Sequence, residues 1–230
     1  MKIPNFKALV PMKHHSERVP EKNIRQFCGK PLLHWIMQSL CESRYVDEII
    51  VNTDSDVIAE AVATFGATVL QRPDHLLGDM VGIQPLIEWD LAHSNGEYYL
   101  QTHSTNPLLT STTIDRAIED FYANPENDSL FSVTPLQTRF YWPDGTPVNH
   151  DPDNLVRTQD LPEILEENSC IYVFSRRMFE KVGHRLGANP LMFRMDFLEA
   201  LDIDEEYDFT VAEAVMQARI SGNRSMKARS

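Results

Sequence analysis

Short apolar segments rich in β-branched and aromatic residues alternate along this chain with segments of helical periodicity. Parallel strands require such an alternation, because the crossover between two of them is usually a helix. The predicted strands cover residues 8–11, 48–52, 68–70, 97–101, 129–133 and 170–174. The predicted helices cover residues 32–42, 56–65, 83–92, 112–122, 177–182 and 209–220. The alternation therefore predicts one α/β domain with a mostly parallel sheet over residues 1–222.

Two segments interrupt this alternation. Residues 136–167 contain several prolines, little periodicity and the aromatic run Phe140, Tyr141 and Trp142. An insertion of this length usually covers a site or packs on a partner subunit. Residues 223–230 are polar and basic, so we predict a disordered tail there.

Charge and composition exclude several classes of protein. The formal net charge of −13 repels phosphate backbones, so nucleic acid is not an expected partner. No apolar run is long enough to span a membrane, and the first residues lack the apolar core of a signal peptide. We therefore expect a cytoplasmic protein without membrane contact. The 3 cysteines show no CxxC spacing, which argues against a disulfide framework or a cysteine zinc site.

The loop after the first predicted strand is the first candidate site. Lys13, Arg18 and Lys22 place three cations within ten residues of an otherwise acidic chain. Ligands of open α/β sheets bind outside the carboxyl ends of strands, where this loop lies. Cationic side chains and loop amides bind phosphate oxygens, and neither a Walker A sequence nor GxGxxG is present. The pattern favours a triphosphate loop of another kind over a merely solvated connection.

A series of motifs begins within this loop and continues in order along the chain. They are SERVPEKN at 16–23, FCGKPL at 27–32, VNTDSDVIA at 51–59, RP at 72–73, TNPL at 105–108, NSCIY at 168–172, and DID at 202–204 with AE at 212–213. Together they resemble the motifs of the CMP-sialic acid synthetase (acylneuraminate cytidylyltransferase) family, over about residues 8–215.

The resemblance implies a Rossmann-like fold of the nucleotide-diphospho-sugar transferase type. It also implies a homodimer in which the insertion 136–167 reaches toward the neighbouring subunit's site. The implied reaction is transfer of CMP from CTP to an acidic sugar, a nonulosonic or related 2-keto-3-deoxy acid, with release of pyrophosphate. Relatives also accept phosphonates, and the sequence does not choose among these acids.

Asp202 and Asp204 are the predicted magnesium ligands. Residues i and i+2 of an extended segment point to the same face, so two carboxylates can hold one hard divalent cation. The resemblance assigns Mg²⁺ to the same pair. An acidic surface turn without a metal is the alternative interpretation.

The resemblance assigns further residues to the site. The predicted catalytic residues are Lys13, Arg18, Lys22 and Asp202, and the predicted nucleotide-binding residues are Pro11, Lys13, Ser16, Arg18, Lys22 and Asn23. The predicted acceptor-binding residues are His103, Thr105, Asn106, Arg139 and Arg157. The two arginines suit a bidentate contact with the acceptor's carboxylate. His103 could hydrogen-bond the substrate, assist deprotonation, or be an ordinary strand-end histidine.

Two other classes of function stay open at the level of sequence. A nucleotide-sugar glycosyltransferase shares the alternation and a DxD motif, although its DxD normally follows a middle strand and this one is near the C-terminus. A non-catalytic nucleotide-binding homologue is motivated by Glu17, which stands where the family has a cation. Release of pyrophosphate from CTP in the presence of candidate acids separates these hypotheses.

Overall fold

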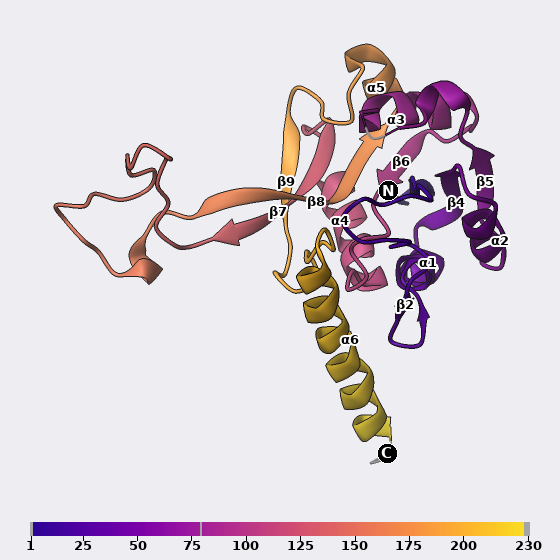
Figure 1. Cartoon of the computed structure of the whole chain (residues 1–230). Coiled ribbons are helices and arrows are strands. Elements are labelled where there is room, and N and C mark those ends of the chain that lie inside the picture. Colours follow the sequence, from indigo (N-terminus) through magenta and orange to yellow (C-terminus); the bar gives the residue numbers. More distant parts are fainter. Residues whose placement is uncertain (1, 79, 228–230) are drawn as a thin grey trace.

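Seven strands form one sheet in the order β5-β4-β1-β6-β8-β7-β9 (Figure 1). In chain order these strands are β1 (Phe6–Leu9), β4 (Val46–Thr53), β5 (Thr68–Gln71), β6 (Tyr98–Gln101), β7 (Ser129–Leu136), β8 (Ile164–Ser175) and β9 (Pro190–Arg194). β8 runs antiparallel to its neighbours β6 and β7, and the other neighbouring pairs are parallel. The computed structural model describes residues 2–78 and 80–227. The predicted mostly parallel α/β sheet is confirmed.

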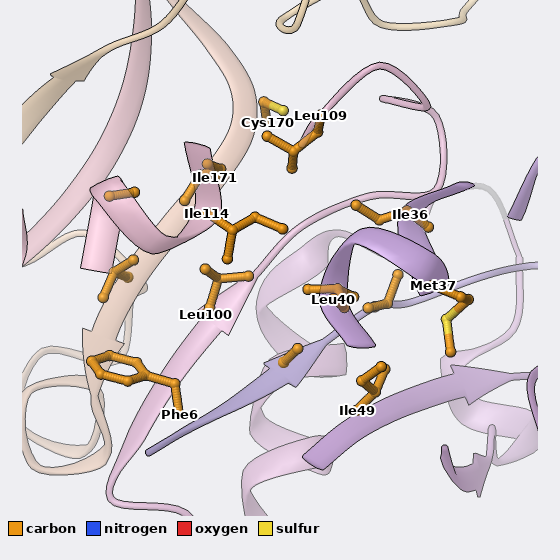
Figure 2. Packing of buried hydrophobic residues seen from close by; sticks show 14 of the residues in the cluster. Phe6, Ile36, Met37, Leu40, Ile49, Leu100, Leu109, Ile114, Cys170 and Ile171 are labelled. Atoms are coloured by element: carbon orange, nitrogen blue, oxygen red, sulfur yellow. The ribbon is translucent and has the colours of Figure 1, made fainter. Parts of the chain in front are cut away.

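Helices cover both faces of the sheet. They are α1 (Leu33–Glu42), α2 (Asp56–Ala63), α3 (Ile83–Ala92), α4 (Ser111–Ala123), α5 (Arg176–Val182) and α6 (Glu206–Lys227), with short 3-10 turns at Asp74–Leu76 and Thr158–Asp160. α1, α2 and α4 contribute to the larger core cluster, and α3 and α5 to the cluster on the opposite face. Figure 2 shows Leu40 of α1 and Ile114 of α4 packed with Leu100 of β6 in the larger cluster.

Local side-chain hydrogen bonds determine where several helices begin. Ser55, Thr110 and Ser175 each accept a hydrogen bond from the backbone N–H three residues further on, at the start of α2, α4 and α5. Such caps satisfy N–H groups that have no partner within the helix. α5 ends at Val182 and is followed by Gly183, whose φ of 72° lies in the left-handed region that glycine adopts without strain. The chain then continues to β9, which begins at Pro190.

The interrupted segment of the sequence is an arm that projects from the body of the molecule (Figure 1). The hairpin of β7 and β8 continues beyond the sheet, and residues 137–163 connect the two strands at its tip. Both ends of the predicted insertion 136–167 therefore lie within strands. Tyr141 and Trp142 on the arm are 55% and 60% exposed. A pair of exposed aromatic side chains on a projecting hairpin is unusual for a surface that meets only water.

α6 is longer than its sequence pattern predicts. Its first half packs through Phe209, Ala212 and Met216 against a cluster that includes Phe27 and Leu108. Beyond that cluster the helix extends away from the body (Figure 1). Residues 223–227 belong to this helix, although the sequence predicts a disordered tail from residue 223, and residues 228–230 of that tail lie outside the described residues.

Three strands escape prediction from the sequence. β9 is 5 residues long and presents Leu191 and Phe193 to the larger core cluster, but only Phe193 is buried, so its pattern is short. The two-residue strands β2 (Gln26–Phe27) and β3 (Lys30–Pro31) form a separate hairpin within the predicted loop region. Across residues 2–78 and 80–227, no helix has both the length and the apolar character needed to cross a membrane.

Candidate active site

Two adjoining cavities lie at the carboxyl edge of the parallel strands. The loop pocket, with a volume of about 340 Å³, is lined by Pro11, Lys13, Ser16, Glu17, Arg18, Lys22, Asn23, His103, Ser104, Thr105 and Asp204. The carboxylate pocket, with a volume of about 360 Å³, is lined by Thr134, Glu166, Glu167, Asn168, Ser169, Phe197, Ala200, Leu201, Asp202 and Asp204. Asp204 lines both cavities, so they meet at this carboxylate.

Backbone and side-chain bonds hold the loop pocket's floor in place. The Met12 N–H donates to Asn52 O at 2.9 Å, which continues the pairing of β1 with β4. The His14 N–H donates to Asp54 Oδ1 at 2.7 Å. Buried Asn23 donates to Lys13 O at 2.8 Å and accepts from Ser104 Oγ at 2.5 Å. Asn23 therefore ties the cationic loop to the end of β6, in addition to lining the pocket.

The end of β4, which anchors this loop, is itself braced from below. Buried Arg72 donates to Asn52 Oδ1 at 2.8 Å and to Asn52 O at 3.0 Å. Asn52 donates in turn to Asp90 Oδ1 at 2.6 Å. Burial raises the pKa of Asp90 to about 7, because the charged carboxylate loses its hydration. The RP motif thus has a structural role beneath the site.

The loop's cations converge on the acidic segment before α6. Arg18 Nη2 lies 2.8 Å from Asp204 Oδ1, and Arg18 Nη1 lies 3.3 Å from Glu205 Oε1. Lys22 Nζ donates to Ile203 O at 2.6 Å and lies 3.6 Å from Asp204 Oδ1. Lys22 and Ile203 are 181 residues apart in the sequence. The charges of the loop and of the acidic segment therefore meet only because the chain folds.

Asp202 and Asp204 share one face of their segment. Ile203 between them is fully buried, and its N–H donates to Thr105 O at 2.9 Å, which places the segment beside the end of β6. Burial raises the pKa of Asp202, and the charges of Asp204 and Asp208 add to that rise. A hydrogen bond from Thr105 and the charge of Lys22 oppose it.

A divalent cation fits this pair. Among the residues that the structure describes, Asp202 Oδ1 is a buried oxygen without a hydrogen-bond partner. The same part of the chain holds no cluster of 3 or more His, Cys, Asp or Glu side chains able to bind a metal. Mg²⁺ is commonly held by one or two carboxylates while water and substrate phosphates complete its shell. The arrangement suits Mg²⁺ that arrives with a phosphate ligand.

His103 and Thr105 lie at the junction of the two pockets. Thr105 hydrogen-bonds Asp202, and both His103 and Thr105 line the loop pocket. Burial lowers the pKa of His103 to about 4, and the positive charges of Arg185 and Lys22 act in the same direction. Asn106 is different, because its buried amide is 3.4 Å from both Ala200 O and Leu201 O and lines neither pocket. Asn106 holds the acidic segment in place.

Comparison with known proteins decides the family. Residues 7–225 match the sequence profile of the family described as Cytidylyltransferase. The chain belongs to the cytidylyltransferase family. It is therefore a nucleotidyltransferase that uses CTP, as the sequence motifs predict.

Relatives and a solved structure agree with this assignment. The cytidylyltransferase is 30% identical over 216 residues to an N-acylneuraminate cytidylyltransferase of Oncorhynchus mykiss, covering 90% of this chain and 49% of that protein. It is 28% identical over 220 residues to a pseudaminic acid cytidylyltransferase of Campylobacter jejuni, covering 90% and 94%. The chain thus spans about half the length of the first relative and nearly all of the second.

The fold is shared with a CMP:2-keto-3-deoxy-manno-octonic acid synthetase solved in complex with CTP. That structure superposes with a TM-score of 0.70 at 15% identity and covers 94% of this chain and 99% of the other. The predicted Rossmann-like transferase fold is confirmed.

The predicted acceptor-binding arginines lie on the arm, away from both pockets of their own chain. Arg139 Nη2 donates to Val156 O at 2.6 Å, within the arm. Arg157 Nε lies 2.6 Å from Asp160 Oδ2, also within the arm. Neither arginine is among the residues that line the two pockets.

Several residues of the site escape prediction from the sequence. Glu167, Ser169 and Phe197 line the carboxylate pocket, and Arg185 lies over the ring of Tyr172, whose hydroxyl donates to Glu167. Ser169 belongs to the NSCIY motif and Glu167 directly precedes it, and this motif is the only sequence signal that points to them. Arg185 belongs to no motif and follows an αL turn, so the tertiary structure alone identifies it.

Proposed function

We propose that this cytidylyltransferase transfers CMP from CTP to a small acidic sugar and releases pyrophosphate. One observation carries the proposal: a cationic pocket and a carboxylate pocket meet at Asp204. Such an arrangement suits a triphosphate on one side and a hydroxyl-bearing acceptor on the other, with the reacting phosphorus between them. Two relatives are named as cytidylyltransferases of N-acylneuraminate and of pseudaminic acid, which supports an acidic sugar as the acceptor.

The loop pocket would bind the nucleotide. Lys13, Arg18 and Lys22 would contact the triphosphate oxygens, and Ser16 would orient the nucleotide. Arg18 is paired with Asp204 and Glu205, so triphosphate binding would draw its guanidinium from these carboxylates to the phosphates. The acceptor hydroxyl would attack the α-phosphorus while pyrophosphate leaves, and positioning and charge neutralisation would supply most of the rate enhancement.

Asp202 and Asp204 would hold Mg²⁺ at the meeting point of the pockets. When bound, Mg²⁺ neutralises charge that develops on the phosphate oxygens. Lys22 contributes charge at the same place, since its ammonium is 3.6 Å from Asp204 Oδ1. The buried Asp202 Oδ1 that lacks a partner in the described part of the chain is the observation that supports a cation here.

The acceptor's acid group needs a cation that the carboxylate pocket does not supply. Among the described residues lining that pocket, none is lysine or arginine, and Glu166 and Glu167 add two further carboxylates. Arg139 and Arg157 belong to the arm instead, where their side chains contact Val156 O and Asp160. We therefore propose a homodimer in which the arm of one subunit brings these arginines to the acceptor in the other.

An activity screen tests the proposed reaction. Pyrophosphate release is measured with each of the four nucleoside triphosphates, Mg²⁺ and a panel containing N-acetylneuraminate, pseudaminate, a 2-keto-3-deoxy-octulosonate and a phosphonate. We expect release only with CTP and with one class of acid. Lys22→Met should abolish it, whereas Lys181→Met, an exposed lysine of α5, should not. CTP binding without release for any acid would instead identify a non-catalytic homologue, and sugar transfer from a nucleotide sugar would identify a glycosyltransferase.

Subunit complementation tests the homodimer. Light scattering should give about twice the 26.4 kDa chain mass. Arg139→Met and Lys22→Met chains, each inactive alone, should regain about a quarter of wild-type activity when mixed, because half of the dimers would then hold one intact site. An active monomer, or mixtures without regained activity, would contradict the shared site. The cytoplasmic location inferred from the sequence stays a prediction.

A further inference from the structure

Arg185 lines neither pocket, but it contacts Tyr172 and Gln101, whose own contacts lead to residues of both. It follows the αL turn at Gly183, and its guanidinium carbon lies 3.4 Å from the centroid of the Tyr172 ring. Its Nη1 donates a hydrogen bond to Gln101 Oε1. Burial lowers the pKa of Arg185, while the groups of Tyr172 and Glu167 oppose that change. A partly buried guanidinium loses hydration, which its contacts with protein groups must replace.

The bond from Arg185 determines the orientation of the Gln101 amide. Arginine can only donate, so the atom of fully buried Gln101 that faces it must be the carbonyl oxygen. The amide nitrogen then faces Thr102 O at 3.1 Å, a carbonyl that can only accept. The two neighbours of Gln101 therefore agree on which end of the amide is nitrogen, independently of how the amide is assigned.

The oriented amide determines the tautomer of His103. Gln101 Nε2 lies 3.0 Å from His103 Nε2 and has only hydrogens to offer. His103 Nε2 must therefore carry its lone pair, and the ring proton must be on Nδ1. The low pKa of His103, about 4, agrees with a neutral ring at physiological pH. With its basic nitrogen already bonded, His103 can donate a hydrogen bond to a ligand but cannot accept a proton from one.

A second set of contacts leads from Arg185 to the carboxylate pocket. The Tyr172 ring over which Arg185 lies carries a hydroxyl that donates to Glu167 and is 3.2 Å from Ser169 Oγ. Burial raises the pKa of Tyr172 to about 12, so the phenol keeps its proton. Glu167 and Ser169 both line the carboxylate pocket. One guanidinium is thus connected to a donor in the loop pocket and to two polar groups in the carboxylate pocket.

We infer that Arg185 is a positioning residue with two roles. Through Gln101 it holds His103 as a neutral Nδ1–H donor toward an oxygen of the bound nucleotide. Through Tyr172 it orients Glu167 in the pocket of the sugar acceptor. This inference rests on the proposed function for the identity of the ligands. The tautomer itself does not depend on any activity. His103 is accordingly not the base that deprotonates the attacking hydroxyl.

Nitrogen NMR of histidine-labelled protein measures the tautomer directly. In the wild type at pH 7 we expect the His103 ring to show a protonated Nδ1 and an unprotonated Nε2, with the signal assigned by its loss in His103→Gln. In Arg185→Met only the contact with Thr102 O still favours this orientation of the Gln101 amide, so we expect the second tautomer to appear beside the first. Arg177→Met, the same chemical change at an exposed arginine of α5, should leave the His103 signal unchanged. A wild-type ring protonated on Nε2, or on both nitrogens, overturns the inference without any variant having to fold.

Kinetics separate positioning from general stability. We expect Arg185→Met to lower kcat/KM for CTP by roughly ten- to hundredfold, as when a supporting group misplaces a substrate-binding donor. Arg185→Lys keeps a donor for Gln101, so it should retain the tautomer and recover part of kcat/KM. Equal kcat/KM for Arg185→Met and Arg177→Met would contradict the positioning role. Failure of the proposed function would give a different result. The wild-type protein would then show the expected His103 tautomer but release no pyrophosphate.

Discussion

Replacement of Asp202 by Asn should separate stability from function at the proposed metal site. Burial and the nearby charges of Asp204 and Asp208 make the ionised Asp202 carboxylate unfavourable, and its Oδ1 has no hydrogen-bond partner within the described chain. Asn has the same size and keeps an oxygen that can accept the bond from Thr105. The substitution therefore removes a buried charge with little change in packing.

The expected effects have opposite signs with and without the metal. Without Mg²⁺, removal of the charge should stabilise the protein by about 1 kcal/mol, which raises Tm by about 2–4 °C in a chain of this length. At Mg²⁺ concentrations about a hundredfold above its dissociation constant, the wild type should gain about 2.7 kcal/mol by mass action. The variant offers one carboxylate fewer and should gain much less. The order of the two Tm values should therefore invert.

Thermal unfolding followed by fluorescence measures this inversion, with CTP present, the acceptor omitted, and Mg²⁺ either titrated or removed with EDTA. Asp120→Asn is a matched control, because it removes one charge from an exposed position of α4. That control should shift Tm equally with and without Mg²⁺. Equal Mg²⁺ responses of Asp202→Asn and the wild type, or a lower Tm of Asp202→Asn in EDTA, would refute the reasoning.

Three further predictions concern the site and its supports. Asp204→Asn should keep the fold and slow pyrophosphate release by roughly a hundredfold, since the carboxylate stabilises charge through the proposed metal. Measurement of the rate against Mg²⁺ concentration checks this. A wild-type rate together with a wild-type dependence on Mg²⁺ would contradict the metal site. Asp90→Asn keeps the bond from Asn52 but removes a carboxylate whose pKa in the folded protein is about 7. The stability that this raised pKa contributes to the wild type is complete below about pH 4 and is lost as pH rises toward 7. Urea unfolding should therefore show the wild type losing up to about 1.4 kcal/mol per pH unit relative to the variant. A difference that is constant with pH would contradict this. Asn23→Ala removes buried hydrogen bonds to Lys13 O and Ser104. The variant should therefore be less stable by about 1–3 kcal/mol and have a higher KM for CTP. Unchanged stability and KM would show that other contacts hold the loop.

Local patterns in the sequence were sufficient for the framework and for the charged core of the site. The alternation of strands and helices predicts the sheet because side-chain periodicity directly reflects which face of an element is buried. Lys13, Arg18 and Lys22 are visible because they crowd within ten residues, and Asp202 and Asp204 because their spacing places both on one face. β9 and the far half of α6 lack such a signal, since most of β9 is not buried and α6 extends beyond its packing partners.

The sequence by itself determined the family, the fold class and which charges gather near the end of β1. Only the tertiary structure decided which of those charges meet, and what lies beneath them. Gln101 and Arg185 are 84 residues apart and belong to no shared motif. They touch because β8 runs antiparallel to β6, which places Tyr172 opposite Gln101, and the Arg185 guanidinium lies over the Tyr172 ring. A side-chain contact across that distance has no local periodicity, and the tautomer that it imposes on His103 cannot be derived until the chain is folded.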